Sequence, residues 1–116
     1  MDIETEVTDK DILIIKVQGR MHLKDLQDIE AQFKALIKGR RAVIIDLSRL
    51  EVLFSMGLRA LIICAQSMEL KGGKLVLMSP SPNVATVLKA SGTTRLIPVC
   101  ADLKAAEAAV FVKSQT

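Results

Sequence analysis

A serine stands where a hydrophobic segment gives way to an amphipathic one. Residues 42–61 read AVIIDLSRLEVLFSMGLRAL, which predicts a strand, a short loop and a helix that begins near Ser55 and Gly57. The start of a helix leaves N–H donors without partners and carries about half a positive charge, so a phosphate group on Ser55 would be stabilised there. Serine is also a favoured N-cap residue, worth about 1 kcal/mol, so the Ser55 hydroxyl is either a modification site or a helix cap.

Other residues that could do chemistry form no recognisable constellation. The chain has a single histidine, His22, and contains neither a GxxxxGK phosphate loop nor an HExxH metal motif. A serine hydrolase elbow needs a glycine two residues before its nucleophile, and Leu53 stands there. Cys64 and Cys100 belong to no CxxC or Cys/His cluster, which argues against zinc. We therefore expect no enzymatic activity, no cofactor and no metal.

The charges give a weak basic excess. Sixteen lysines and arginines stand against 13 aspartates and glutamates, for a net charge of +3. One basic cluster falls at the end of a predicted helix, where cations complement the helix dipole, and comprises Lys34, Lys38, Arg40 and Arg41. With no tryptophan or tyrosine and only three phenylalanines, the chain lacks platforms for stacking bases, so we expect no nucleic-acid partner.

The hydropathy pattern gives no sign of export or membrane insertion. The first seven residues, MDIETEV, are acidic where a secretory signal would be basic. The longest apolar run, residues 60–65, is far shorter than the ~20 residues that cross a bilayer. The two cysteines fit small apolar core residues in a reducing compartment. We expect a cytoplasmic protein.

The elements that would position Ser55 alternate along the chain. Two β-rich segments joined by a polar connection predict a hairpin, and the later apolar segments alternate between helical and strand periods. The expected strands are residues 3–7, 12–17, 43–45, 74–78 and 96–99. The expected helices are residues 26–38, a helix from Met56 to Gly72-Gly73, a third that follows Ser81-Pro82 and ends at Gly92, and a last one containing Leu103, Ala106 and Val110.

Capping residues set the expected helix boundaries. Asp25 is the predicted N-cap of the first helix, and Gly39 follows its last periodic residue as a helix-ending glycine. Ser81 precedes a proline at the first position of the third helix, and Asp102 is the predicted N-cap of the last one.

The order of these elements defines the fold class. It is β-β-α-β-α-β-α-β-α, an α/β arrangement with about four helices. The mixed sheet would combine an antiparallel N-terminal hairpin with parallel strands joined by right-handed connections. At 116 residues the chain has the length of one domain, so we expect a single domain over residues 1–116.

The segment around Ser55 resembles the signature of the STAS domain, the family of bacterial anti-sigma factor antagonists. In that family a strand ends with Asp-Leu-Ser and an Asp-Ser-Ser-Gly-Leu turn follows. Asp46, Leu47 and Ser48 match the first part, and residues 57–61 match the part of the family pattern that follows the phosphorylated serine. Ser55 matches the serine that a cognate kinase phosphorylates. The resemblance implies the STAS fold along nearly the whole chain.

Three positions depart from the family pattern. Phe54 stands where the family usually has aspartate, and Met56 where it usually has a second small hydroxyl residue. His22 replaces an acid in the turn after the second strand, and is either a solvated loop residue or part of the partner surface. Phe54 either tucks under the helix, the commoner fate of a phenylalanine, or lies exposed beside Ser55 as an interface anchor that Met56 extends.

The resemblance implies a protein-interaction switch in bacterial transcription regulation. The unmodified domain would bind an anti-sigma factor or a serine/threonine kinase, phosphorylation of Ser55 would release it, and a phosphatase is a further candidate partner. The implied partner-binding residues are His22, Phe54, Ser55, Met56, Gly57 and Arg59. The alternative is a STAS adaptor without phosphorylation, either a scaffold in a signalling assembly or the cytoplasmic subunit of a lipid-transporting ABC complex. The sequence leaves the oligomeric state open.

Overall fold

A mixed sheet runs through the part of the chain that the structure describes, residues 2–20 and 23–112 of this computed structural model. Its strand order within those residues is β1-β2-β3-β4-β5. β1 pairs with β2 antiparallel and the other neighbours are parallel, which confirms the sheet expected from the sequence. The strands are β1 (Asp2–Val7), β2 (Leu13–Gly19), β3 (Ala42–Leu50), β4 (Lys74–Met78) and β5 (Val99–Cys100).

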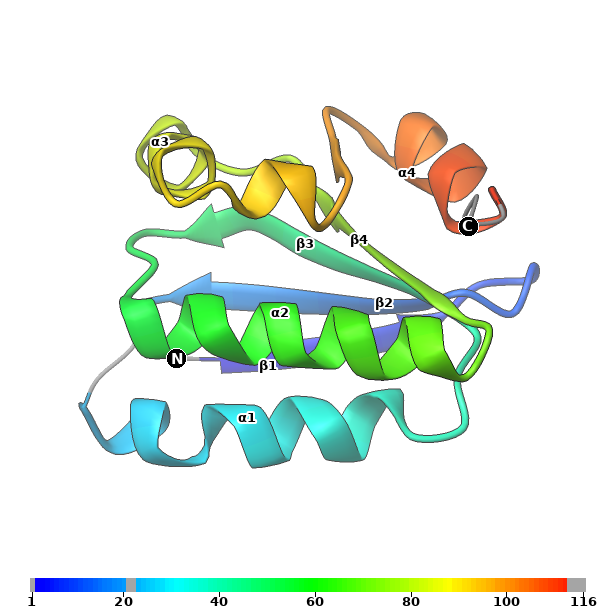
Figure 1. Ribbon diagram of the computed structural model, residues 1–116, viewed down its shortest axis with the longest axis horizontal. Coiled ribbons are helices and arrows are strands. Elements are labelled where there is room, and N and C mark those ends of the chain that lie inside the picture. The colour runs from blue at the N-terminus through cyan, green and yellow to red at the C-terminus, as the bar shows by residue number, and fades with distance from the viewer. Residues whose placement is uncertain (1, 21–22, 113–116) are drawn as a thin grey trace.

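Helices cover both faces of this sheet (Figure 1). In the described ranges they are α1 (Leu23–Ile37), α2 (Ser55–Leu70), α3 (Pro82–Ala90) and α4 (Leu103–Val110), with a 3-10 turn, η1 (Thr93–Arg95). α1 and α2 lie side by side along one face, whereas α4 packs on β3, β4 and β5 from the other. The expected element order and the expected helices are confirmed.

Successive side chains along the strands point to opposite faces of the sheet, and this produces two apolar cores. Leu13 and Ile15 of β2 point toward α1 and α2 and belong to the larger core, which also includes Phe33 of α1. Ile14 and Ile44 point the opposite way and are buried beneath α4. The first half of β3 is therefore buried on both faces, as its continuous apolar run predicted.

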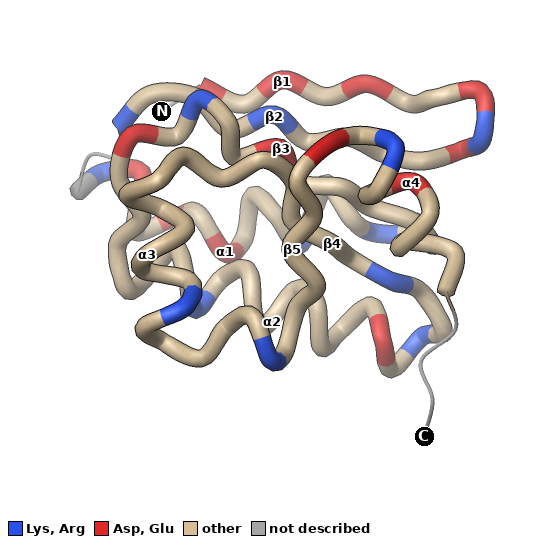
Figure 2. The backbone as a smooth tube through the Cα atoms, turned by 90° about the horizontal axis from the view of Figure 1, so that it is seen from above, with Lys and Arg blue, Asp and Glu red and all other residues tan. Residues whose placement is uncertain are grey.

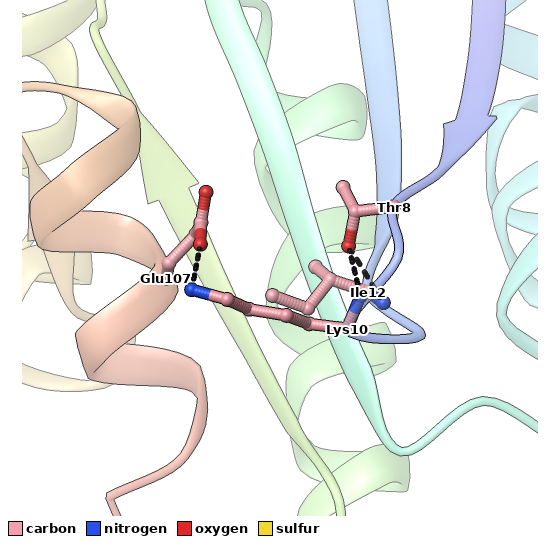
Figure 3. Close-up of polar contacts among 4 residues, drawn as sticks. All are labelled: Thr8, Lys10, Ile12 and Glu107. Carbon is pink, nitrogen blue, oxygen red and sulfur yellow. Dashed lines mark hydrogen bonds and ion pairs between the residues drawn. The ribbon is translucent and has the colours of Figure 1, made fainter.

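A charged contact ties the β1–β2 hairpin to the last helix (Figure 3). Nζ of Lys10 donates to Oε2 of Glu107 over 2.9 Å, and this hydrogen bond and the carboxylate charge raise the pKa of Lys10. Within the turn, the Thr8 hydroxyl accepts from the backbone N–H groups of Lys10 at 3.3 Å and Ile12 at 3.2 Å. These contacts hold the hairpin against α4 although the paired residues are 97 positions apart in sequence.

The first helix starts earlier than expected, so the prediction that Asp25 is its N-cap is wrong. α1 includes Leu23 and places Asp25 in its first turn, where a negative charge still complements the helix dipole. Leucine and lysine at positions 23 and 24 are good helix formers, which explains the extension. Gly39, with φ of 76°, follows the end of α1 as predicted.

The strand expected at residues 96–99 is mostly a turn. The N–H groups of Leu96 and Ile97 both donate to the carbonyl of Thr93 at 2.9 Å, so the segment first completes η1. Ile97 is buried while Leu96 is 58% exposed, and Pro98 has no N–H to donate to a strand ladder. Ile97 therefore fills the core from a turn, and the strand β5 begins only after Pro98, whose carbonyl accepts from the N–H of Leu77 in β4 over 2.9 Å.

β3 is longer than the apolar run that predicted it. Its register with β2 shifts by one residue in its second half, which marks a β-bulge. Leu47 and Leu50 are therefore both buried, while Ser48 and Arg49 are both exposed. The bulge breaks the strict alternation by which a strand is recognised from sequence, and it brings the chain to the loop before α2.

The edge strand β1 carries an acidic stripe. Asp2, Glu4 and Glu6 alternate along it and therefore share one face, and Figure 2 shows these acidic positions spaced along the strand. Glu4 pairs in register with Lys16, which pairs in turn with Asp46. This half of the sheet face is polar, in contrast to the half beneath α4.

Candidate functional site

The helix that carries Ser55 begins without a side-chain cap. Phe54 holds the N-cap position with φ of −91° and ψ of 162°, and its side chain makes no capping hydrogen bond. Ser55 is the first helical residue, so the alternative in which its hydroxyl caps α2 is wrong. The backbone N–H of Leu58 donates to the carbonyl of Phe54 over 2.9 Å. The N–H groups of residues 55–57 precede that bond and point out of the helix start.

The side chains around Ser55 are exposed and apolar. Phe54 is 40% exposed and Met56 is 50% exposed, and Ser55 between them is exposed as well. The commoner fate of a phenylalanine, burial beneath the helix, is therefore wrong here, because buried Leu53 fills that place instead. Gly57 is buried, so among the predicted binding residues that the structure describes it is the one turned away from solvent.

The electrostatics of this helix start favour a negative group. The described residues of the first turn of α2 include no acidic side chain, so the positive end of the helix dipole is left uncompensated. Arg59 is exposed and lies four residues after Ser55, which places both on the same side of the helix. A phosphate on Ser55 would thus meet N–H donors and a cation one turn away.

Backbone and side-chain contacts fix the loop between β3 and α2. The N–H of Glu51 donates to the carbonyl of Gly19 over 3.0 Å, and Oε2 of Glu51 lies 3.8 Å from Nε of Arg20. On the other side, Oγ of Ser81 donates to the carbonyl of Leu50 over 3.2 Å. The loop is therefore held between the end of β2 and the start of α3. His22, two residues beyond Arg20, lies outside the described residues.

A polar hollow lies on the sheet face next to this loop, and sequence reasoning missed it. Its volume is about 300 Å³, and its polar lining comprises Glu4, Lys16, Gln18, Asp46, Ser48 and Arg49. Oδ1 of Asp46 accepts from the N–H of Ser48 over 2.9 Å, so this carboxylate of the signature stabilises the bulge in β3. The available signal was the polar residue at every second position of β2 after Ile14.

The cysteines have no reactive geometry. Cys64 is fully buried in α2, and burial raises the pKa of its thiol from 9.0 to about 11, so it stays protonated at neutral pH. Burial also raises the pKa of Cys100, which is partly exposed on β5. Over residues 2–20 and 23–112, histidine, cysteine and carboxylate side chains form no group of three that could hold a metal ion. In the same ranges, no helix combines the length and apolarity needed to cross a membrane.

Comparison with known proteins supplies the context for this geometry. The family model described as "STAS domain" matches residues 2–106. The Bordetella bronchiseptica protein BtrV is 35% identical over 99 residues, which are 84% of this chain and 85% of that protein. Its name describes it as an anti-sigma factor antagonist.

Solved structures share the fold. An anti-sigma factor antagonist from Mycobacterium paratuberculosis superposes with a TM-score of 0.79 at 25% identity, covering 94% of each chain. The Bacillus cell fate determinant SpoIIAA in its phosphorylated form superposes with a TM-score of 0.70 at 19% identity, covering 93% of this chain and 99% of that one. At that identity the SpoIIAA match shows the fold alone.

Proposed function

The chain belongs to the STAS domain family, and on that premise we propose that it is a protein-interaction switch of the anti-sigma factor antagonist type. Its partner would be an anti-sigma factor or a serine/threonine kinase, with a phosphatase to reverse the modification. The observation that carries the proposal is the exposed Ser55 at the first position of α2, between two exposed apolar side chains. In this proposal residues 1–116 act as one cytoplasmic binding domain without an enzymatic activity of its own.

The unmodified surface binds through apolar anchors. Beside Ser55, Phe54 and Met56 expose apolar area that a partner can bury. Arg59 supplies a charged contact one helical turn along, and the Ser55 hydroxyl supplies a polar one. The turn that leads to His22 is held against the same loop by the contacts of Glu51, which supports a contribution from that turn.

Phosphorylation of Ser55 reverses the preference of this surface. A phosphoserine adds about −1.5 to −2 charges at neutral pH, and the helix start and Arg59 stabilise it in the free protein. In the complex the same phosphate would be buried between apolar side chains and the partner, which costs several kcal/mol unless the partner provides cations. The free state is therefore favoured once Ser55 is modified.

Phosphate transfer to one defined serine tests the switch. The protein is incubated with ATP, magnesium and a serine kinase encoded beside it, and intact-mass spectrometry is expected to show the addition of one phosphate group. Ser55→Ala should abolish the addition. Ser48→Ala is the matched control, because Ser48 is also exposed but lies on the bulge of β3, and it should leave the addition unchanged. An active kinase that leaves the chain unmodified contradicts the switch.

One observation favours a second function, a STAS adaptor that works without phosphorylation. Phe54 occupies the N-cap position and is exposed together with Met56, so a partner can dock there through apolar contacts alone. The adaptor could serve a signalling assembly or a lipid-transporting ABC complex. The two functions are separated by adding ATP and the active kinase to the preformed complex. The partner of a switch should be released as Ser55 is phosphorylated, whereas the partner of an adaptor should stay bound to an unmodified chain.

A further inference from the structure

A second hollow lies at the end of α2 opposite to Ser55. Its volume is about 460 Å³, within the range of small-molecule sites. Buried Ile37 and Met68 give it an apolar lining, and Ser67 adds a hydroxyl group. Five cationic side chains surround it, and we call it the basic hollow: Lys34, Lys38, Arg40, Arg41 and Lys71. These side chains come from the end of α1, the loop before β3 and the end of α2.

The positive charge of the basic hollow is only partly neutralised. Nζ of Lys34 lies 3.1 Å from Oε2 of Glu30, and a nitrogen of the Arg40 guanidinium lies 3.7 Å from Oδ1 of Asp11. The remaining cations are all exposed and form no ion pair with a residue in the described ranges; they are Lys38, Arg41 and Lys71.

Complementing the helix dipoles accounts for part of this charge. The C-terminal ends of α1 and α2 meet at the basic hollow and together supply about one negative charge. That is less than the charge of the three cations that lack a carboxylate partner. The surplus remains available to an anion from outside the chain, and the apolar lining would desolvate such an anion more than a flat surface does.

The rim of the basic hollow is also held in place. The N–H of Lys74 donates to the carbonyl of Arg41 over 2.8 Å, and the N–H of Gly73 donates to the carbonyl of Met68 over 2.8 Å. A Cβ atom at Gly73 would lie 2.9 Å from the Arg41 carbonyl oxygen, so only glycine fits between these segments. The cations of the two segments are thus attached to a backbone that is already in position.

We propose that the basic hollow is a binding site for a small ligand that carries several phosphate groups. Several neighbouring cations on three segments match a ligand with several anionic oxygens better than a single carboxylate. α2 is 16 residues long, so the site lies roughly 24 Å along the helix from Ser55. The site is therefore separate from the proposed switch, so its ligand and a switch partner can occupy the protein at the same time.

Calorimetric titration with inorganic tripolyphosphate tests the site. Saturable binding that weakens as salt is raised is expected, because surface cations are screened. The double variant Lys38→Glu, Arg41→Glu should weaken binding at least about tenfold. The matched control is Lys89→Glu, Arg95→Glu, which makes the same charge change on exposed residues outside the hollow and should change affinity less than about twofold. Unchanged melting temperatures show that both variants fold.

Two further arms identify the chemistry and its source. Binding to vesicles that contain a lipid with a phosphorylated headgroup is compared with binding to phosphatidylcholine vesicles. Stronger binding to the first kind that is lost in Lys38→Glu, Arg41→Glu supports the proposal and identifies a lipid as the source of the phosphate groups. A polyglutamate peptide that binds as tightly as tripolyphosphate overturns it in favour of an acidic protein partner. It is also overturned if neither phosphate probe binds, or if the control variant loses as much binding as the hollow variant. Ser55→Ala should bind tripolyphosphate normally, so failure of the switch leaves this result unaffected.

Discussion

The two ends of α2 present opposite surfaces on one rigid element. At its start, Phe54 and Met56 are exposed, and positive charge comes from the helix dipole and from one cation, Arg59, a turn along the helix. At its end, lysine and arginine side chains surround a hollow and outweigh the negative end of the dipole. In the function that we propose, the anion at the first end is a phosphate group attached to the chain. In our proposal for the basic hollow, the anion at the second end arrives from solution.

This difference shows where each property is encoded. At the N-terminal end of α2 the donors are backbone groups that any sequence would supply. What the sequence determines there is which residue begins the helix and so lies beside these donors. The C-terminal end depends on side-chain identity and on how closely two loops approach each other at Gly73. Substitutions should therefore separate the two ends cleanly.

Phosphorylation of Ser55 should have the largest effect on partner binding, because it makes the apolar end of α2 anionic. We expect the modified protein to bind its anti-sigma factor or kinase at least about 100-fold more weakly, since each 1.4 kcal/mol is tenfold and burying the charge costs several kcal/mol. Isothermal calorimetry with purified partner measures this. Ser67→Asp places a negative charge at the other end of α2 and should leave partner affinity within about twofold. Equal losses in the two proteins would contradict a partner surface at the start of α2.

Removing the aromatic anchor should weaken partner binding by a smaller amount than phosphorylation does. Phe54→Ala should weaken partner binding by about 2 kcal/mol, as loss of a central aromatic anchor does. The free energy of unfolding should change less, because the ring is 40% exposed in the free protein. Leu70→Ala is the matched control, since Leu70 is 89% exposed at the opposite end of the helix. Surface plasmon resonance and urea unfolding measure both variants, and a similar loss of binding in Leu70→Ala would argue against Phe54 as an anchor.

Gly73→Ala is expected to disturb the basic end alone. The new methyl group would meet the Arg41 carbonyl oxygen at 2.9 Å and Cε of Met68 at 3.2 Å. Overpacking of this kind costs about 1 to 2 kcal/mol, measured as a shift of the urea midpoint. Partner binding at Ser55 should be unchanged, while tripolyphosphate binding should weaken. Lys71→Ala, which removes a cation and adds no atoms near Arg41, should weaken tripolyphosphate binding without the loss of stability.

The middle of α2 gives the smallest expected effect, a pH dependence. Burial raises the pKa of Cys64 from 9.0 to about 11, so between these values the unfolded chain has lost a proton that the native chain keeps. The contribution of Cys64 to the free energy of unfolding is therefore fully present below about pH 9 and is lost as the pH rises toward 11. The melting temperature should fall over that interval, and less steeply in Cys64→Ala.

The raised pKa of Lys10 acts in the same direction, because the ion pair with Glu107 is lost when the lysine deprotonates. The proteins with and without Cys64→Ala are therefore compared in a Lys10→Met background, which removes the titration of Lys10. If their melting temperatures then change identically with pH, Cys64 is not the group responsible.

Much of the fold follows from the sequence because its elements are locally consistent. β4 is found at the expected residues, 74–78, and Asp102 caps α4 by accepting from the N–H of Ala105 over 2.9 Å, as predicted. The expected strand at 96–99 fails because burial of Ile97 gives an apolar signal that a turn can also satisfy. Local periodicity identifies which residues are buried more securely than it identifies the backbone that buries them.

The candidate site was predictable in position but not in exposure. Strand, loop and helix signals placed Ser55 at the start of a helix, which the structure confirms. Leu53 is buried in the core and Phe54 is exposed. Because both residues are apolar, the sequence does not indicate which of the two is buried. The basic hollow required the ends of α1 and α2 to meet, and only the first of these ends carries the cluster seen in sequence.

The two edges of the sheet have a consequence for how copies of the protein behave when concentrated. An edge strand is a template for fibril growth, because its unpaired backbone groups can extend into another molecule. Here one edge is β1, whose acidic stripe would repel the same stripe on a second copy, and the other is β5, which is only two residues long. The protection at β1 is electrostatic and exposed to solvent, so a high salt concentration would screen it and make that edge the place where aggregation begins.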